Sequence, residues 1–154
     1  MDAIDKVKEF LDPYGLRIIE LEESTRTSDL AAQALGVEVG QIAKTLAFVG
    51  KTKAVLVVTS GDTRIDNKSL RKTVGEKMRM ASPEEALELT GYAPGGVCPF
   101  GVAQDLPVLI DLSMERFPVV YAAAGTPNSA VPVSVEQLLT ITGGTPCRVS
   151  QIQS

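Results

Sequence analysis

The sequence predicts an α+β fold in which a mixed, mostly antiparallel and curled β-sheet, barrel-like in shape, is flanked by helices. Short apolar runs of strand length recur along the chain, and several are joined by tight turns. Amphipathic segments with helix-capping residues lie between them, without the regular alternation of strand and helix that a doubly wound sheet requires. The length of 154 residues suits a single domain that covers residues 1–154.

The first elements are expected to be two helices with a short strand between them. Residues 2–11 carry apolar side chains at helical spacing, and the Asp-Pro-Tyr-Gly sequence at 12–15 ends that pattern. Residues 16–21 alternate loosely and contain β-branched bulk, which favours a strand. Residues 28–35 are expected to form the second helix, and Gly36 is placed to end it.

A β-hairpin is expected next. Residues 42–49 alternate like a strand, and residues 54–59 form the continuous apolar run that is typical of a fully buried strand. The Gly-Lys-Thr-Lys sequence at 50–53 supplies the turn between them. A short helix at 66–74, capped by its first or second residue, and a short strand at 76–80 are expected to follow.

Two further helices are indicated by capping boxes, in which a serine is followed three residues later by Glu or Gln. Ser82 and Glu85 open a helix that continues to Thr90, and Ser134 and Gln137 open the last helix. Strands are expected at residues 108–112, 118–123, 131–133 and 147–152.

The most restrictive feature of the composition is that none of the 154 residues is histidine. This excludes Ser-His and Cys-His catalytic pairs, histidine-based zinc sites and the commonest general base at neutral pH. Cys98 and Cys147 lie far apart without CxxC spacing, which favours free thiols in a reducing compartment. No apolar run approaches the roughly 20 residues that span a bilayer, and the N-terminus does not resemble a secretory signal. We therefore expect a cytoplasmic protein without a membrane segment or a metal site.

A local basic segment stands out against the net charge of −4, which argues weakly against a general nucleic-acid coat. Its cationic residues are Arg64, Lys68, Arg71, Lys72, Lys77 and Arg79. The segment fits either a solvated helix face or a surface that binds phosphates.

Lys44 is the first candidate functional residue, because it lies in the strand predicted at 42–49. It shares one face of that strand with Ile42, Leu46 and Phe48. A lysine in register with core residues has to direct its charge to water, a partner or a ligand. Snorkelling at a strand end is the alternative interpretation.

A glycine-rich loop at residues 91–101 is the second candidate site. It contains four glycines, two prolines and no charged residue, in the sequence GYAPGGVCPFG. Glycine permits close backbone approach and proline stiffens the chain, so the loop is expected to be shaped and semi-rigid. Consecutive amides in such a loop can hold an anion or a carbonyl oxygen. A long turn between two elements is the alternative.

Together these segments resemble the YbaK/prolyl-tRNA-synthetase-associated editing family. The resemblance is carried by Ala31–Gly36, by the strand Gln41–Phe48 with its lysine, by the loop Gly91–Gly101 and by the turn Ala123–Gly125. That family includes free-standing aminoacyl-tRNA deacylases and the editing domain inserted in prolyl-tRNA synthetases. The resemblance implies a mixed α/β fold with a central curled sheet, and it implies no cofactor and no metal.

The resemblance also implies roles for single residues. Lys44 matches the family's strand lysine, which holds the 3′-terminal end of the tRNA and positions the ester. Gly95, Gly96 and Val97 match the start of a GxxxP loop whose backbone amides surround the acyl ester. Cys98 and Pro99 complete that loop. The resemblance also implies that four further residues form the substrate-binding wall: Thr25, Thr45, Gly125 and Asn128.

Two departures from the family pattern leave the edited amino acid open. The family often places a histidine or an aspartate soon after the glycine of the final turn, whereas this chain has Thr-Pro-Asn-Ser at 126–129. Some alanine editors carry asparagine where this chain has Thr45.

The function that the resemblance implies is hydrolysis, in trans, of tRNA mischarged with a small amino acid such as Ala, Ser, Thr or Cys. An aminoacyl ester is activated, so positioning and oxyanion stabilisation suffice, with water activated by the substrate's own ribose hydroxyl. Mischarged tRNA is the expected partner, and its phosphates are expected to bind Arg64, Lys68, Arg71 and Lys72. An aminoacyl-tRNA synthetase is a candidate second partner.

Three alternatives stay open at this point. The same site could serve a non-catalytic tRNA- or synthetase-associated binding module, or a small-molecule esterase or amidase that uses the glycine loop as an oxyanion hole. A covalent role for Cys98 is the third, although its thiol has no evident base in a chain without histidine.

Overall fold

The computed structural model describes residues 2–153 of the chain. Its helices are α1 (Ala3–Leu11), α2 (Ser28–Leu35), α3 (Asn67–Val74), α4 (Pro83–Thr90) and α5 (Val135–Thr142). Its strands are β1 (Ile19–Glu20), β2 (Ile42–Val49), β3 (Ala54–Ser60), β4 (Thr63–Ile65), β5 (Arg79–Met80), β6 (Val108–Asp111), β7 (Val120–Ala122), β8 (Ser129–Val133), β9 (Thr145–Cys147) and β10 (Ser150–Ile152). Short 3-10 helices lie at η1 (Asp12–Tyr14), η2 (Val39–Gln41) and η3 (Leu112–Arg116).

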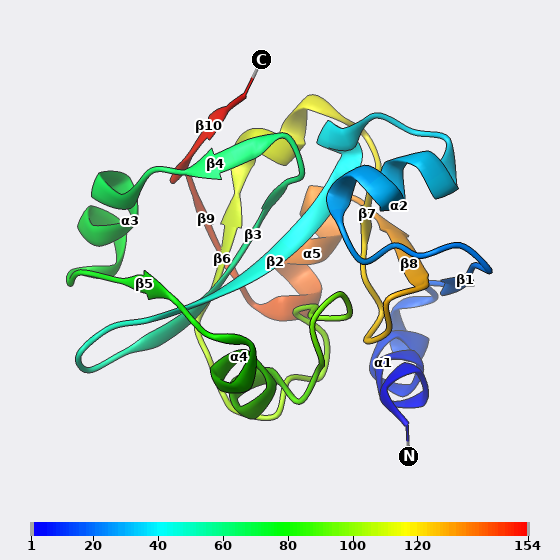
Figure 1. The fold of residues 1–154 in the computed structure, drawn as a ribbon, viewed down its shortest axis with the longest axis horizontal. Helices are drawn as coiled ribbons and strands as arrows, with labels where there is room; N and C mark the ends of the chain where they lie inside the picture. Colours follow the sequence, from blue (N-terminus) through cyan, green and yellow to red (C-terminus); the bar gives the residue numbers. More distant parts are fainter. Residues whose placement is uncertain (1, 154) are drawn as a thin grey trace.

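Within these residues the main sheet follows the order β1-β8-β7-β2-β3-β6-β9, with β5 joined to β2, while β4 and β10 form a second, two-stranded sheet. Neighbours β2/β3, β2/β5, β7/β8 and β1/β8 are antiparallel, and β2/β7, β3/β6 and β6/β9 are parallel. The predicted mixed, mostly antiparallel and curled sheet is thus confirmed. It does not close into a barrel, because β1 and β9 end the sheet at opposite sides (Figure 1).

Alternation along the central hairpin divides the core between the two faces of the sheet. Leu56 and Val58 face a large cluster that also takes in apolar residues of α1 and α5. Val55 and Val57 face a second cluster that contains Leu70 of α3. A third cluster lies where α2 covers the beginning of β2 (Figure 1). The sheet is therefore covered by helices on both faces, which explains the continuous apolar run of β3.

Local sequence signals set the helix boundaries. Both predicted capping boxes form, one between Ser82 and Glu85 and one between Ser134 and Gln137. Thr27 caps α2 by accepting a hydrogen bond from the Leu30 amide. The helices at 2–11, 28–35, 66–74, 82–90 and 134–141 are confirmed to within a residue or two at their ends.

Some strand predictions were wrong in extent. The terminal strand expected at residues 147–152 is two strands in different sheets, because β9 pairs with β6 and β10 pairs with β4. The strand expected at 16–21 is reduced to β1. The sequence analysis did not predict β4, whose short polar sequence is held by its pairing with β10. In the described part of the chain, no helix combines the length and the apolar character needed to cross a bilayer.

Asp111, at the end of β6, is a buried carboxylate that connects three strands. It accepts hydrogen bonds from the Thr59 hydroxyl of β3 (3.0 Å), the Val149 amide (2.9 Å) and the Ser150 hydroxyl of β10 (2.6 Å). The Ser113 amide also donates to it, at 3.3 Å. Burial acts to raise the pKa of Asp111, but the hydrogen bonds outweigh it and hold the pKa below the usual value.

This arrangement predicts that Asp111→Ala destabilises the fold strongly. Removing the carboxylate leaves several buried donors without acceptors, and we expect the free energy of unfolding to fall by about 3 kcal/mol. The folded-state pKa is depressed, so the stabilisation is complete above the unfolded pKa of about 3.9 and is lost as the pH falls through the lower, folded value. Urea denaturation at pH 7 and at low pH measures both effects.

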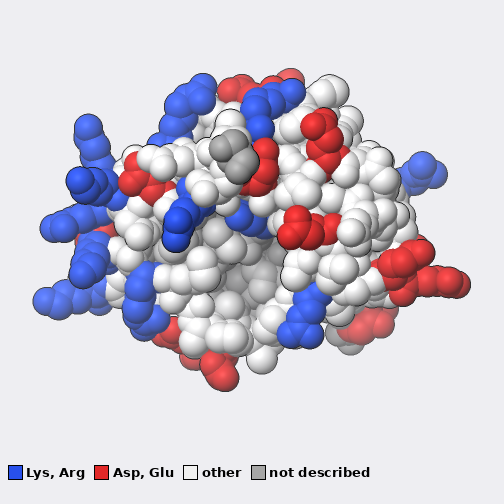
Figure 2. All heavy atoms as spheres, turned by 45° about the horizontal axis from the view of Figure 1, so that its top comes forward, with Lys and Arg blue, Asp and Glu red and all other residues white. Residues whose placement is uncertain are grey.

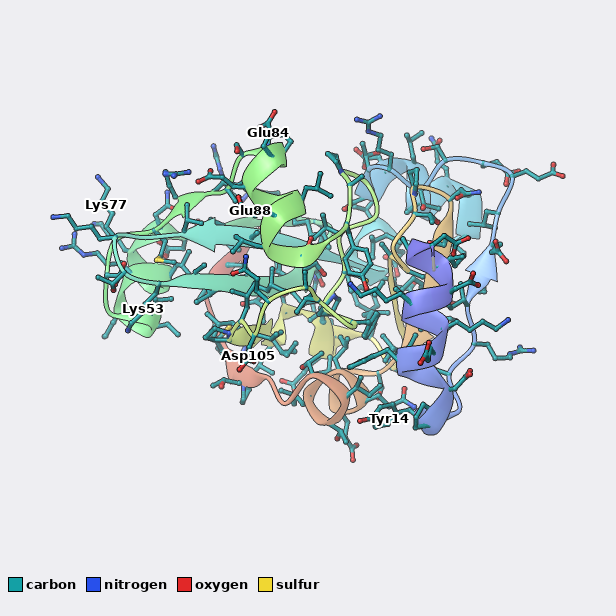
Figure 3. The ribbon with its side chains drawn as sticks, turned by 90° about the horizontal axis from the view of Figure 1, so that it is seen from below. Tyr14, Lys53, Lys77, Glu84, Glu88 and Asp105 are labelled. Atoms are coloured by element: carbon teal, nitrogen blue, oxygen red, sulfur yellow. The ribbon has the colours of Figure 1, made fainter. Side chains whose placement is uncertain are left out.

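Asp105→Ala is the matched control, because Asp105 is an exposed carboxylate (Figure 3). It is expected to change the free energy of unfolding by less than about 0.5 kcal/mol. Equal stabilities of the two variants would contradict the role assigned to Asp111.

Candidate active site

A cavity of about 310 Å³ lies at the beginning of β2, beneath α2. Its walls come from residues 25–28, from the inner side of α2, from residues 42–46 of β2 and from the adjoining ends of β7 and β8. Gly95 and Val97 of the glycine-rich loop complete it. The two segments that the sequence analysis singled out, the strand with Lys44 and the glycine-rich loop, therefore meet at one cavity.

The cavity exists because one edge of β2 is shared by two strands that do not meet. β7 pairs with Ile42 and Ala43, and β5 pairs with Phe48 and Val49, while β3 runs along the whole opposite edge. In an antiparallel strand the backbone N–H and C=O of alternate residues point to the same side. The Ala47 carbonyl accepts a hydrogen bond from the Ala81 amide on the β5 side. The N–H and C=O of Thr45 therefore also point to this side, where no strand of the described residues lies opposite.

Lys44 and Thr45 reach the cavity from opposite faces of β2, because the cavity wraps around the open edge. The half-buried Lys44 ammonium donates to the Thr63 carbonyl at 2.7 Å. Burial lowers the pKa of Lys44, and the negative charge of Asp62 partly offsets this effect. An ammonium has three N–H donors, so the bond to Thr63 leaves two for a ligand.

The Thr45 hydroxyl is buried and has no hydrogen-bond partner within residues 2–153. A buried hydroxyl without a partner is unfavourable by about 1–3 kcal/mol, so Thr45 lowers the local stability of the cavity wall. Thr25, on the facing wall, already donates to the Ser129 carbonyl at 3.2 Å. Among the hydroxyls of the cavity wall, that of Thr45 is thus the one that is buried without a partner in the described residues.

The shape of the glycine-rich loop depends on a close contact between two backbone segments. Gly95 has a φ of +87°, which favours glycine. A Cβ on Gly96 would lie 2.5 Å from the Gly125 carbonyl carbon and oxygen and 2.7 Å from the Thr126 nitrogen. Gly96 and Gly125 therefore pack directly against each other, and they fix the loop beside the open edge of β2.

The amides of this loop are not equally free. The Gly96 amide donates to the Ala93 carbonyl at 3.0 Å, which closes a turn within the loop. The Val97 amide donates to no acceptor in the described residues, and Val97 lines the cavity. The Val97 amide, and the Thr45 amide on the open edge, are therefore two of the backbone donors at the cavity wall that are without an acceptor among the described residues.

Several residues expected at the site do not line the cavity. Gly96 and Gly125 lie behind its wall, as described above. Cys98 is completely buried, and burial raises the pKa of its thiol to about 12. Pro99 is buried as well, and the Asn128 side chain donates to the Leu21 carbonyl at 2.9 Å. Their contribution is to the shape of the loops around the cavity.

The four basic residues expected to contact tRNA lie outside the cavity. Arg64 is on β4, and Lys68, Arg71 and Lys72 are on α3. Basic side chains gather at this end of the molecule, whereas acidic ones predominate at the opposite end (Figure 2).

The sequence analysis missed several polar residues of the cavity wall, among them Arg26, Tyr121 and Ser129. Arg26 is exposed at the cavity mouth, and its side chain lies beside Gly95. Tyr121 and Ser129 belong to β7 and β8, whose position beside β2 follows from tertiary pairing. No local motif marks any of the three.

Chemically, the cavity offers positive charge and hydrogen-bond donors but no general base. Its charged side chains are Lys44 and Arg26, and within the described residues no carboxylate or thiol lines it. Such a site can bind an anion, orient an ester and stabilise an oxyanion. A proton acceptor for an attacking water has to come from elsewhere, and the substrate can supply one.

The chain is similar to known proteins in sequence and in fold. Residues 22–141 match the family model described as "Aminoacyl-tRNA editing domain". YwhH of Bacillus subtilis, described as uncharacterized, is 46% identical over 122 residues, which cover 79% of this chain and 78% of that protein. EbsC of Enterococcus faecalis, named "Putative Cys-tRNA(Pro)/Cys-tRNA(Cys) deacylase", is 29% identical over 145 residues, which cover 93% and 88% of the two chains.

A crystal structure described as that of "a putative trans-editing enzyme for prolyl tRNA synthetase" superposes with a TM-score of 0.90. Its sequence is 40% identical, and the match covers 98% of each chain. The protein therefore belongs to the aminoacyl-tRNA editing domain family, as the resemblance predicted.

The contact between Gly96 and Gly125 gives a direct prediction. Gly96→Ala forces the added Cβ against the backbone at Gly125, so the loop has to move away from the open edge of β2. We expect hydrolysis of a mischarged tRNA to fall at least about tenfold. A deacylation time course measures it, and thermal unfolding shows whether the variant is folded.

Gly143→Ala is the control. Gly143 has a φ of +65° and no heavy atom within 4 Å of an added Cβ, and it lies at the end of α5. This variant is expected to lose about 1 kcal/mol of stability and to keep its hydrolysis rate. If Gly96→Ala were as active as Gly143→Ala, the loop position would not matter.

Proposed function

We propose that the protein is a trans-editing hydrolase that deacylates tRNA mischarged with a small amino acid. The observation that carries the proposal is a small cavity with a half-buried lysine and free backbone donors, lined within residues 2–153 by no carboxylate, thiol or histidine. Hydrolysis of an activated ester is a reaction that such a site can perform by positioning alone. Aminoacyl-tRNA is formed in the cytoplasm, which is where this function requires the protein to be.

In this mechanism Lys44 holds the terminal phosphate or the ribose, so that the acyl group enters the cavity. The ester carbonyl oxygen accepts hydrogen bonds from the Val97 and Thr45 amides, and these bonds strengthen as negative charge develops on it. Gly95 and Gly96 give the loop its position. Water attacks the carbonyl carbon while the neighbouring ribose hydroxyl accepts the water's proton and gives its own to the departing ribose oxygen, as the bond between the carbonyl carbon and that oxygen breaks.

The cavity walls favour a small acyl group. Several of the side chains around it are alanines, on α2, β2, β7 and β8. The unpartnered Thr45 hydroxyl supplies a polar contact for the substrate's amino group or for a hydroxyl or thiol side chain. Ala, Ser, Thr and Cys are therefore the acyl groups to test, and we would test Cys first because the relative EbsC is named as a putative Cys-tRNA deacylase.

A non-catalytic binding module is the second candidate. The absence of a general base from the cavity wall fits a protein that only holds the end of a tRNA, alone or beside an aminoacyl-tRNA synthetase. The description of the structural relative names prolyl-tRNA synthetase. Prolyl-tRNA synthetase is therefore the first synthetase to test for association with this protein.

The test is deacylation of tRNAs charged with Ala, Ser, Thr, Cys and Pro by the wild-type protein and by Lys44→Ala. We expect turnover of at least one small-acyl tRNA, and a fall of at least about 100-fold in the variant because the ester is no longer positioned. Lys8→Ala is the matched control, since Lys8 is exposed on α1 and lines neither the cavity nor the basic end of the molecule. Its rate is expected to equal that of the wild type.

Two outcomes would contradict this proposal. Binding of tRNA without turnover of any ester would favour the binding module. Turnover that survives Lys44→Ala would remove Lys44 from the mechanism.

A further inference from the structure

The cavity of about 310 Å³ that is proposed to hold the acyl group is called the acyl cavity below. A second cavity, of about 530 Å³, lies directly beside it and shares Lys44 and Leu46 with it. We call it the exit groove. It lies on the face of β2 that carries Lys44, between β4 and the beginning of α3 on one side and the segment Met78–Met80 on the other. The two cavities therefore adjoin at the Lys44 side chain.

The floor and walls of the exit groove differ in character. Leu46 and Phe48 continue the side-chain row of Lys44 along β2 and give the groove an apolar floor. Met80 stands at its rim with 56% of its surface exposed, which is unusual for a large apolar side chain. A soft, exposed apolar surface of this kind suits the face of a nucleobase.

The charged side chains of the groove all have the same sign. Lys44, Arg64 and Arg79 line it, and no carboxylate lines it within residues 2–153. Arg79 is held in place by Glu85 through contacts of 2.7 and 2.9 Å. Arg64 is exposed on β4 and forms no ion pair with a described residue. Its guanidinium is therefore free to bind a phosphate.

The surroundings continue this pattern. Basic side chains gather at the end of the molecule that carries α3, β5 and the turn between β2 and β3 (Figure 2). Lys53 and Lys77 extend from this end, whereas Glu84 and Glu88 project from α4 on the other side of the groove (Figure 3). A polyanion leaving the acyl cavity is thus attracted toward α3 and repelled by α4.

We propose that the exit groove binds the single-stranded nucleotides that precede the terminal adenosine of the tRNA. The proposal rests on the function proposed above, since the acyl cavity fixes where the terminal nucleotide lies. Lys44 then contacts the phosphate at the junction of the two cavities, Arg64 contacts the next phosphate, and a base lies against Met80. The basic residues of α3 meet the duplex beyond the groove.

The test compares the affinities of the protein for one uncharged tRNA in two forms, complete and lacking its last three nucleotides. We expect Arg64→Ala to bind the complete tRNA about tenfold more weakly, because a charge-assisted contact is lost, and to bind the truncated tRNA as the wild type does. Met80→Ser is expected to show the same selectivity with a smaller loss. Both residues are exposed, so the variants should fold, and circular dichroism checks this.

Lys72→Ala is the matched control. Lys72 is a cation of α3 that does not line the exit groove, and its loss is expected to weaken binding of the complete and truncated tRNAs by the same factor. The proposal is overturned if Arg64→Ala also weakens both forms equally, or weakens neither.

Turnover of a mischarged tRNA, measured on the same wild-type protein, separates the two proposals. If the protein hydrolyses a mischarged tRNA, and Arg64→Ala weakens binding of the complete and truncated tRNAs equally, the exit groove is refuted and the hydrolase proposal stays in place. If Arg64→Ala weakens binding of the complete tRNA alone, and the protein hydrolyses no mischarged tRNA, the exit groove is supported and the hydrolase proposal is refuted.

Discussion

The candidate site depends on how the edge of β2 is shared. β3 satisfies one edge along the whole strand, whereas β7 and β5 each occupy one end of the other edge. The gap between them leaves backbone groups of Thr45 without a neighbouring strand, and it lets a cavity wrap around β2. Unpaired edges are normally covered or blocked in proteins. Here the glycine-rich loop approaches the gap without pairing with it, which leaves room for a ligand.

The site is built at some cost in local stability. Lys44 is half buried with a lowered pKa, and the Thr45 hydroxyl is buried without a partner. The Thr63 carbonyl that anchors Lys44 belongs to a residue whose hydroxyl lies 2.8 Å from that of Thr59, and Thr59 in turn donates to Asp111. The lysine is therefore oriented by a buried polar network that also ties β3, β6 and β10 together. Such support by packed and hydrogen-bonded neighbours is what a site that works by positioning requires.

The sequence predicted the elements whose signals are local. Both capping boxes, the hairpin of β2 and β3 and the in-register position of Lys44 follow from periodicity and from a few polar residues, and the structure confirms them. The short strand β4 and the separation of β9 from β10 could not be predicted, because their pairing partners lie far away in the sequence. Arg26 and Ser129 could not be predicted as site residues either, because the other residues of the cavity wall that they lie beside are distant in the sequence. Cys98 lies within the recognised loop motif, but the fold turns its side chain into the core.

The central claim is that the protein positions an ester and the substrate supplies the base. The most direct measurement is the single-turnover hydrolysis rate of one mischarged tRNA, compared with the same tRNA ending in 2′-deoxyadenosine and acylated on its 3′ oxygen. The account predicts that removing the ribose hydroxyl slows hydrolysis by at least about 100-fold, the usual contribution of a general base. Equal rates for the two substrates would contradict it, because a group of the protein would then have to activate the water.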